Sequence, residues 1–142
     1  MKIALALALA LTLAFGAITW AALEAGGGVA VVETRAEDGS PRSTHVWYVE
    51  EDGELWLEAG TPENAWYQDV LRDPVLGFHS EGRVGRYLAE PSEDGERHRW
   101  LRERLAAKYG WRDRWVSLYV DQDRSLAVRL MLARERGTKR VE

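Results

Sequence analysis

Residues 40–73 read SPRSTHVWYVEEDGELWLEAGTPENAWYQDVLRD, and this stretch decides the fold that we expect for the chain. Residues 42–50 and 54–59 both have the β-branched and aromatic content of strands. The Asp52-Gly53 pair between them is a strong signal for a tight hairpin. We therefore expect two antiparallel strands, with Leu55 and Leu57 on one side of the second strand.

A capped helix is predicted directly after this hairpin. Thr61 has the side chain of an N-cap, Pro62 suits the first helical position, and Glu63 places a carboxylate in the first turn. Asp73-Pro74 ends the pattern, because proline cannot continue a helix. The i, i+4 spacing predicts a buried stripe made of Trp66, Tyr67, Val70 and Leu71.

The rest of the chain supplies more short strands. An Asp38-Gly39 turn joins residues 29–36 to residues 42–50, and Glu81-Gly82 marks another hairpin. The further strands are predicted over residues 29–36, 75–79, 83–90 and 126–133. Six short strands linked mostly by hairpins can close on themselves and so remove their edges. The expected fold class is α+β, mainly antiparallel β, in the form of a six-stranded barrel with two or three helices.

Two helices are predicted in the second half of the chain. Residues 93–109 follow Ser92 as a candidate cap and end at Gly110. Its buried stripe is predicted to comprise Trp100 or Leu101, Leu105 and Tyr109. Residues 111–121 are predicted to be helical around Trp115 and Leu118.

The N-terminus is an uncharged apolar run, residues 3–23, which is long enough to cross a hydrocarbon layer as a helix. It is also compatible with a cleaved signal peptide, although the run exceeds the usual apolar length and has no clear cleavage site. Lys2 favours an N-terminus inside and a domain outside the cytoplasm. We expect residues 1–23 as anchor or signal peptide, 24–28 as linker, 29–134 as barrel domain, and 135–142 as a charged, disordered tail.

Composition narrows the range of functions. Basic and acidic residues number 19 and 23, so the surface has no general attraction for nucleic acid. The absence of cysteine excludes thiolate catalysis and zinc–thiolate sites. The three histidines, His45, His79 and His98, lack the spacing of metal ligands, so no metal is expected.

Three segments carry a resemblance to a known family. They are Asp38 to Thr44 with its G-x-P-R pattern, Leu55 to Gly60, and Asn64 to Leu71 followed by Asp73-Pro74-Val75. In these segments the chain resembles the split-β-barrel flavin- and deazaflavin (F420)-dependent reductases. That superfamily includes the pyridoxamine-phosphate oxidases and the deazaflavin-dependent nitroreductases.

The resemblance implies a cofactor site for coenzyme F420 or FMN. Its residues would be Arg42, Ser43, Thr44, Val46, Ala59, Gly60, Thr61 and Trp66. Arg42, Ser43 and Thr44 would lie beside the phosphate, and Trp66 beside the ring system, although its spacing also fits core packing. An arginine and a helix N-terminus both favour an anion, so we expect Arg42 and Thr61 to converge on one positively polarised notch.

One segment departs from the family pattern. The first turn begins Ala36-Glu37-Asp38, where deazaflavin enzymes of this family usually have basic residues. These carboxylates would repel an acidic cofactor tail by a few kcal/mol at most. FMN, a weakened F420 site and no cofactor at all therefore remain alternatives.

The function implied is a membrane-anchored flavin- or deazaflavin-dependent oxidoreductase that transfers hydride to a quinone or nitro-type acceptor. Its partners would be a small-molecule substrate, the membrane and a second copy in a homodimer, because the superfamily commonly binds its cofactor at a subunit interface. The alternative is a non-catalytic anchored barrel that has lost the cofactor or binds another flat ligand.

Overall fold

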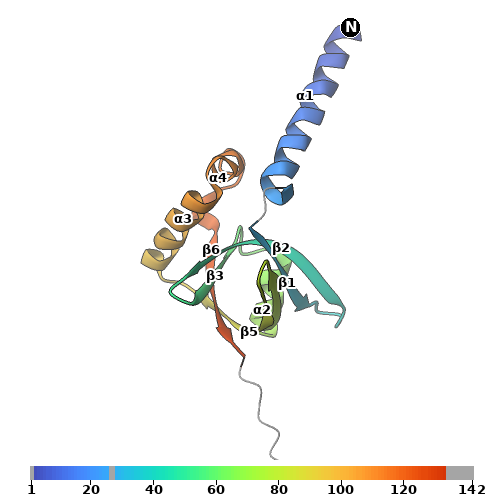
Figure 1. Cartoon of the computed structure of the whole chain (residues 1–142). Helices are drawn as coiled ribbons and strands as arrows, with labels where there is room; N and C mark the ends of the chain where they lie inside the picture. Colours follow the sequence, from blue (N-terminus) through green and yellow to red (C-terminus); the bar gives the residue numbers. More distant parts are fainter. Residues whose placement is uncertain (1, 26–27, 134–142) are drawn as a thin grey trace, which may run out of the picture.

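The computed structural model describes residues 2–25 and 28–133 and shows one closed six-stranded barrel (Figure 1). The strands are β1 (Val29–Arg35), β2 (Pro41–Glu51), β3 (Glu54–Ala59), β4 (Val75–Ser80), β5 (Arg83–Ser92) and β6 (Leu126–Leu132). They run in the order β1-β2-β3-β6-β5-β4, and every neighbouring pair is antiparallel. The expected fold class is confirmed.

The hairpin between β2 and β3 forms where the Asp-Gly pair predicts it. Asp52 and Gly53 both have positive φ, 52° and 80°, which is the conformation of a two-residue turn whose twist matches the strands. The turn sets Glu51 opposite Glu54 and Tyr48 opposite Leu57. This register carries the apolar side of β3 into the barrel.

Three long-range pairings close the barrel. β1 pairs with β4, placing Val32 opposite Phe78, and β6 inserts between β3 and β5. The interior is filled by fully buried side chains, the largest of which include Phe78, Leu55, Leu57, Leu76 and Val32. Closure leaves no unpaired edge among the six strands, which is how small β proteins avoid edge-to-edge association.

Helix α2 (Ala65–Arg72) packs on the barrel core through Trp66, Tyr67 and Val70. Its start differs from the predicted one, because Asn64 rather than Thr61 precedes the first helical residue. The Asn64 Oδ1 atom accepts the Thr61 N–H at 2.6 Å, which closes a turn ahead of the helix and delays its start. Leu71, predicted to be buried, is 54% exposed.

Helix α3 (Gly95–Tyr109) covers the outside of the barrel. Its buried residues Leu101, Leu105 and Tyr109 pack with Val49, Trp56 and Ala127 of the strands, so the predicted stripe is confirmed. Ser92 is the last residue of β5 and not the cap. Asp94 is the cap instead, since its side chain accepts the Glu96 N–H at 2.9 Å. Gly110, with φ of 56°, ends the helix as predicted.

Helix α4 (Trp111–Val116) is shorter than the helix predicted over residues 111–121. The chain continues through turns to the 3-10 segment η2 (Gln122–Arg124). Leu118 therefore lies beyond the helix and is 77% exposed.

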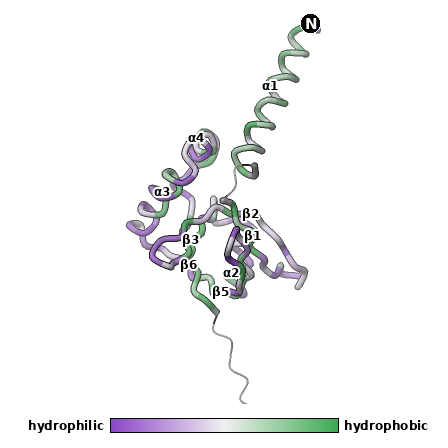
Figure 2. Tube along the Cα trace, viewed as in Figure 1, coloured by the Kyte–Doolittle hydropathy of each residue, from purple (hydrophilic) through white to green (hydrophobic). Residues whose placement is uncertain are grey.

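Helix α1 (Lys2–Trp20) continues into a π-helical turn, η1 (Ala21–Ala25), and projects away from the barrel (Figure 1). Figure 2 shows that it is hydrophobic along its length. The segment Lys2–Leu23 is long and apolar enough, by length and composition, to cross a membrane. The charged tail predicted at residues 135–142 lies outside the described residues.

Tyr109 joins α3 to β2 and to Gly28, the residue before β1. Its hydroxyl donates to the Gly28 carbonyl at 2.7 Å and accepts the Tyr48 N–H at 3.1 Å, and its ring stacks on Trp47 with centroids 4.3 Å apart. Tyr109→Phe is expected to lower the free energy of unfolding by about 1–2 kcal/mol, because two backbone groups lose a partner. Equilibrium denaturation by urea measures the change.

The burial of the Tyr109 hydroxyl also predicts that the free energy of unfolding decreases at alkaline pH. Burial raises the pKa of Tyr109 to about 12. The unfolded chain loses this proton near pH 10, so the Tyr109 contribution to stability should be present below pH 10 and lost as the pH rises towards 12. In Tyr109→Phe this part of the decline should disappear. Tyr119→Phe, at a tyrosine that is 46% exposed, is the control and should keep the decline.

Candidate functional site

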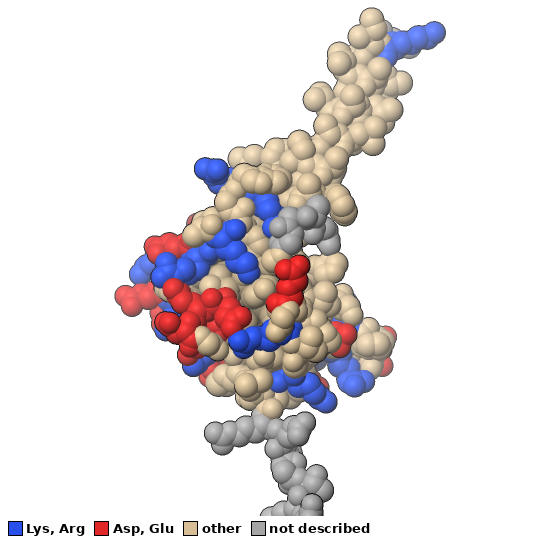
Figure 3. All heavy atoms as spheres, viewed as in Figure 1, with Lys and Arg blue, Asp and Glu red and all other residues tan. Residues whose placement is uncertain are grey.

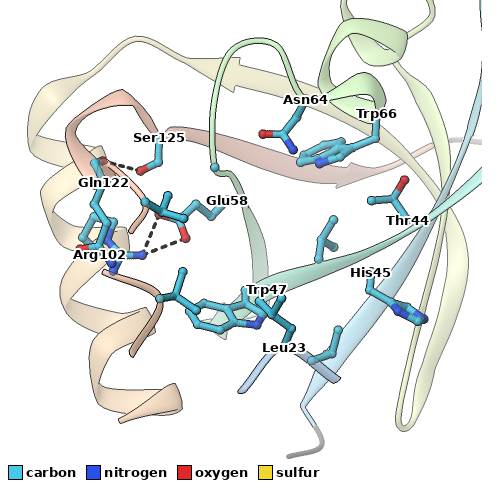
Figure 4. Close-up of a pocket in the computed structure, with 15 residues that line it drawn as sticks. Leu23, Thr44, His45, Trp47, Glu58, Asn64, Trp66, Arg102, Gln122 and Ser125 are labelled. Atoms are coloured by element: carbon cyan, nitrogen blue, oxygen red, sulfur yellow. Dashed lines mark hydrogen bonds and ion pairs between the residues drawn. The ribbon is translucent and has the colours of Figure 1, made fainter. Parts of the chain in front are cut away.

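A cavity of about 250 Å³ lies outside the barrel wall, between β2 with the end of β3 on one side and α3 with the α4–β6 connection on the other (Figure 4). Its apolar lining consists of Leu23, Val29, Val46, Trp47, Trp66, Val116 and Val120. Its polar lining consists of Thr44, His45, Glu58, Gln122, Ser125, Asn64 and Arg102, together with Gly60. An apolar cavity with a few polar side chains is the common form of a small-molecule site.

Trp66 forms part of the cavity wall and of the core at the same time. It stands in the first turn of α2, is only 2% exposed, and meets Tyr67 edge to face at 6.2 Å. In Figure 4 its ring lies along the cavity beside Asn64. Trp66 is therefore packed in the core, as its spacing predicts, and it also lies where it could contact a ligand in the cavity.

The bend from β3 to α2 shapes this end of the cavity. Gly60 lines the cavity, and an added Cβ there would meet only the Asn64 Oδ1 atom, at 3.7 Å, among the described atoms nearby. Asn64 in turn holds the Thr61 N–H. The Gln68 Nε2 atom also donates to the Pro62 carbonyl at 2.7 Å, so side chains of two residues hold the bend, and open space remains next to Gly60.

A buried ion network forms the opposite wall. The Arg102 Nη1 atom donates to both carboxylate oxygens of Glu58, at 2.7 and 2.8 Å, and Nη2 donates to Asp113. These side chains are 14%, 11% and 7% exposed, respectively. Burial opposes the charge of Arg102, but the two carboxylates outweigh it and raise its pKa. The network ties β3 to α3 and α4.

A polar corner adjoins this wall. The Ser125 hydroxyl donates to the Gln122 carbonyl at 2.8 Å, and the His98 Nε2 atom lies 2.8 Å from the same hydroxyl. Gln122 also donates through Nε2 to the Ser117 hydroxyl at 2.6 Å. Ser125 lines the cavity, so this chain of hydrogen bonds connects the cavity to His98 on α3.

The eight residues proposed from the resemblance fall into two groups. Thr44, Val46, Gly60 and Trp66 line the cavity together. Ser43 is exposed on the other face of β2, and Ala59 is fully buried in the barrel core. Thr61 bonds Asn64, and Arg42 turns to α2.

Arg42 belongs to a charge cluster on α2 and not to the cavity wall. Its Nε donates at 2.7 Å to Asp69, which also accepts from Thr34 at 2.7 Å and from Arg72. Glu37 lies 3.7 Å from Arg72. Two arginines thus face two carboxylates, so the cluster has little excess positive charge. The expected convergence of Arg42 and Thr61 on one notch is replaced by separate pairings.

Sequence reasoning missed the far wall of the cavity. Arg102, Gln122 and Ser125 lie more than 40 residues beyond Glu58 in the chain, and no local pattern links them. Within residues 2–25 and 28–133, no cluster of three histidine, aspartate or glutamate side chains is arranged to hold a metal ion.

The closed six-stranded antiparallel barrel, with a helix between its third and fourth strands, has the split-β-barrel architecture expected from the sequence. The sequence model of the F420H(2)-dependent quinone reductases matches residues 17–132. The chain belongs to this family, and the resemblance seen in the sequence is confirmed.

Solved structures share the fold. The conserved hypothetical protein Rv2991 from Mycobacterium tuberculosis superposes with a TM-score of 0.58 at 20% identity, covering 80% of this chain and 78% of its own. An FAD-binding protein from Mesorhizobium loti gives 0.55 at 17% identity, with 76% and 83% covered. An F420-H2-dependent reductase gives 0.51 at 19% identity, with 73% and 94% covered. No curated relative matches the chain.

Proposed function

We propose that this protein is a membrane-anchored reductase that binds coenzyme F420 or FMN at the cavity and transfers hydride to a quinone or nitro-type acceptor. The observation that carries the proposal is the cavity itself. It brings Thr44, Val46, Gly60 and Trp66 together in a chain of the F420H(2)-dependent quinone reductase family. The similar FAD-binding and F420-H2-dependent structures support a flavin-type cofactor.

The lining fits the flat ring system of such a cofactor. Val46 and Trp66 offer apolar and aromatic faces, and Thr44 and Asn64 offer hydrogen-bonding groups at the edge. The volume of about 250 Å³ lies below the usual range for a drug-sized ligand, so the cavity suits the ring and not the whole cofactor. The ribityl and phosphate part would extend along β2, where Arg42 stands two residues from Thr44.

The charge cluster bears on the choice between the two cofactors. Arg42 and Arg72 are already paired with Asp69, and Glu37 adds a second carboxylate. A cofactor tail with many carboxylates would meet little net attraction there. We therefore propose that this cluster binds the acidic tail of the cofactor only weakly.

A bound reduced flavin or deazaflavin supplies the hydride. The chain supplies orientation, through the wall of Val46 and Trp66, and a route for protons. Reduction of a quinone takes up a proton with each hydride. One cavity-lining group that could relay this proton is the Ser125 hydroxyl, which would turn from the Gln122 carbonyl towards the acceptor while the His98 Nε2 atom replaces the proton.

Membrane anchoring is the second part of the proposal. Helix α1 has the length and hydropathy of a membrane span, and Lys2 favours the barrel outside the cytoplasm. Leu23, just after α1, lines the cavity, which places the cavity next to the base of the anchor. A lipid-soluble quinone is the acceptor that this position suits.

A homodimer is the third part. The cavity is partly open to solvent, and the part of a cofactor that extends beyond it needs a cover. A second copy of the chain placed over the cofactor tail along β2 would provide that cover and would help to exclude water from the site of hydride transfer.

Binding of the cofactor is tested with the full chain in detergent micelles. Titration with FMN and, separately, with F420 is followed by visible absorbance and by quenching of tryptophan fluorescence. Binding of either at tens of micromolar or below, with reduction of a short-chain quinone by the reduced cofactor, is expected. Binding without turnover, or no binding of either, would favour the non-catalytic barrel.

Filling the space beside Gly60 should block the cofactor. Gly60→Leu projects a side chain into the cavity without backbone strain, because Gly60 does not have a positive φ. Steric overlap of about 1–3 kcal/mol would weaken binding by roughly 5- to 150-fold. Gly95→Leu is the matched control, since a Cβ there also meets open space and Gly95 lies on α3, outside this cavity. Equal affinities for the two variants would place the cofactor elsewhere.

A further inference from the structure

Helix α4 and the turn after it carry large apolar side chains on the surface. Trp111 is 52% exposed, Leu118 is 77% exposed and Tyr119 is 46% exposed. Three large apolar side chains exposed within nine consecutive positions are more than the surface of a soluble domain usually carries. Figure 1 shows that this segment lies at the level of the lower end of α1.

The segment is fixed against α1 by side-chain contacts. The Phe15 ring lies 5.5 Å from Trp115 and 6.0 Å from Tyr119, between centroids. The Trp115 Nε1 atom donates to the Thr19 hydroxyl at 3.1 Å, and Arg112 Nε donates to the Ala22 carbonyl at 2.5 Å. The position of α4 along the axis of α1 is therefore set by three different residues of α1 and η1.

These contacts place the segment at a definite membrane depth. Trp20, 63% exposed at the end of α1, suits the headgroup region, where tryptophan rings concentrate. Phe15 precedes it by five residues, which is about 7–8 Å along a helix axis. Side chains that touch Phe15 and Thr19 then lie at, or just inside, the same headgroup layer.

The distribution of charged residues near α1 is consistent with a position of α4 in the headgroup layer. In Figure 3 uncharged and basic side chains lie beside the lower end of α1, and the acidic residues on the visible face lie farther from it. Arg114 of α4 is exposed and can meet a lipid phosphate. Tryptophan, tyrosine and leucine with a nearby arginine are the composition of an interfacial segment.

We propose that α4 and the turn at residues 117–120 form a second membrane contact, lying in the headgroup layer of the bilayer that α1 crosses. The proposal rests on the membrane anchoring given under the proposed function. Val116 and Val120, which flank the apolar turn, line the cavity. The contact therefore holds the cavity mouth at the lipid surface, where a long-chain quinone can enter without crossing water.

Site-specific labelling tests the contact, and the chain suits it because it has no cysteine. The full-length variant Leu118→Cys is labelled with the fluorophore NBD and reconstituted in vesicles of phosphatidylcholine and phosphatidylglycerol. Leu132→Cys is the matched control, because Leu132 is 71% exposed and ends β6 at the side of the barrel away from α1 (Figure 1). Nitroxide lipids are expected to quench the label at 118 at least about threefold more than at 132.

A third label separates this proposal from the anchoring on which it rests. Leu11→Cys, at a residue of α1 that is 70% exposed, should be quenched by nitroxides deep in the acyl chains. Quenching at 11 together with equal, weak quenching at 118 and 132 would overturn the second contact alone. Absence of quenching at 11 would overturn the anchoring and the contact together.

Discussion

Arg102→Met is expected to lower the free energy of unfolding by about 3–5 kcal/mol, the usual cost of removing one partner from a buried ion network. Arg102 is 14% exposed and holds Glu58 and Asp113, which are 11% and 7% exposed. The methionine would leave two carboxylates close together with no cation between them. Denaturant titration of the full chain measures the loss.

Two further variants make this expectation specific. Arg104→Met, two residues along α3, removes an arginine from an ion pair with Glu51 whose side chains are 45% and 35% exposed. An exposed pair of this kind should cost about 1 kcal/mol or less. Adding Glu58→Gln and Asp113→Asn to Arg102→Met should restore part of the loss, because the repulsion disappears. Equal costs for Arg102→Met and Arg104→Met would contradict the buried network.

The substitution Arg102→Met should also weaken cofactor binding at the cavity. Glu58 and Arg102 form its wall, so loss of the network loosens the packing of α3 against β3 at this point. In Arg102→Met we expect weaker cofactor binding even under conditions where the chain remains folded. The binding titration described for Gly60→Leu measures this effect.

Asp69→Ala is expected to cost about 2–3 kcal/mol of stability, somewhat below the usual range for a buried ion pair, because Arg42 and Arg72 are partly exposed to water. Asp69 is 2% exposed and accepts hydrogen bonds from Thr34, Arg42 and Arg72. It joins α2 to β1 and β2. Thermal and denaturant unfolding should both report the change.

The pH dependence of this effect has a definite sign. Burial alone would raise the pKa of Asp69, but the hydrogen bonds from Thr34 and Arg42 and the charges of Arg42 and Arg72 outweigh it, so the pKa is lowered. The stabilisation is therefore complete above the ordinary aspartate value near pH 4 and is lost as the pH falls through the lower folded value. Asp69→Ala should flatten the acid limb of the stability curve. Glu81→Ala, at an exposed turn residue, should leave that limb unchanged.

The sequence predicted those features that depend on neighbouring residues. The Asp52-Gly53 pair has the positive φ angles of a hairpin, and the 3.6-residue spacing of Leu101, Leu105 and Tyr109 gives the buried face of α3. Closure of the barrel followed from the number of short strands, because unpaired edges are unfavourable. Local steric and hydrophobic rules were sufficient for these elements.

Local rules were not sufficient where two groups competed for one partner. Thr61 has the properties of an N-cap, but Asn64 takes its N–H and the helix begins later. Arg42 has the properties of an anion-binding residue, but Asp69, 27 positions away, pairs with it. Each outcome depends on which groups the folded chain brings within hydrogen-bonding distance.

The sequence by itself determined the barrel, the apolar helix α1, the family, and four of the residues that line the cavity, because Thr44, Val46, Gly60 and Trp66 lie within one continuous stretch. Only the tertiary structure decided the rest of the lining. The packing of α3 and of the α4–β6 connection against β2 and β3 brings Arg102, Gln122 and Ser125 to the cavity. Contacts between residues so distant in the chain depend on how the whole barrel closes, and no local pattern in the sequence encodes them.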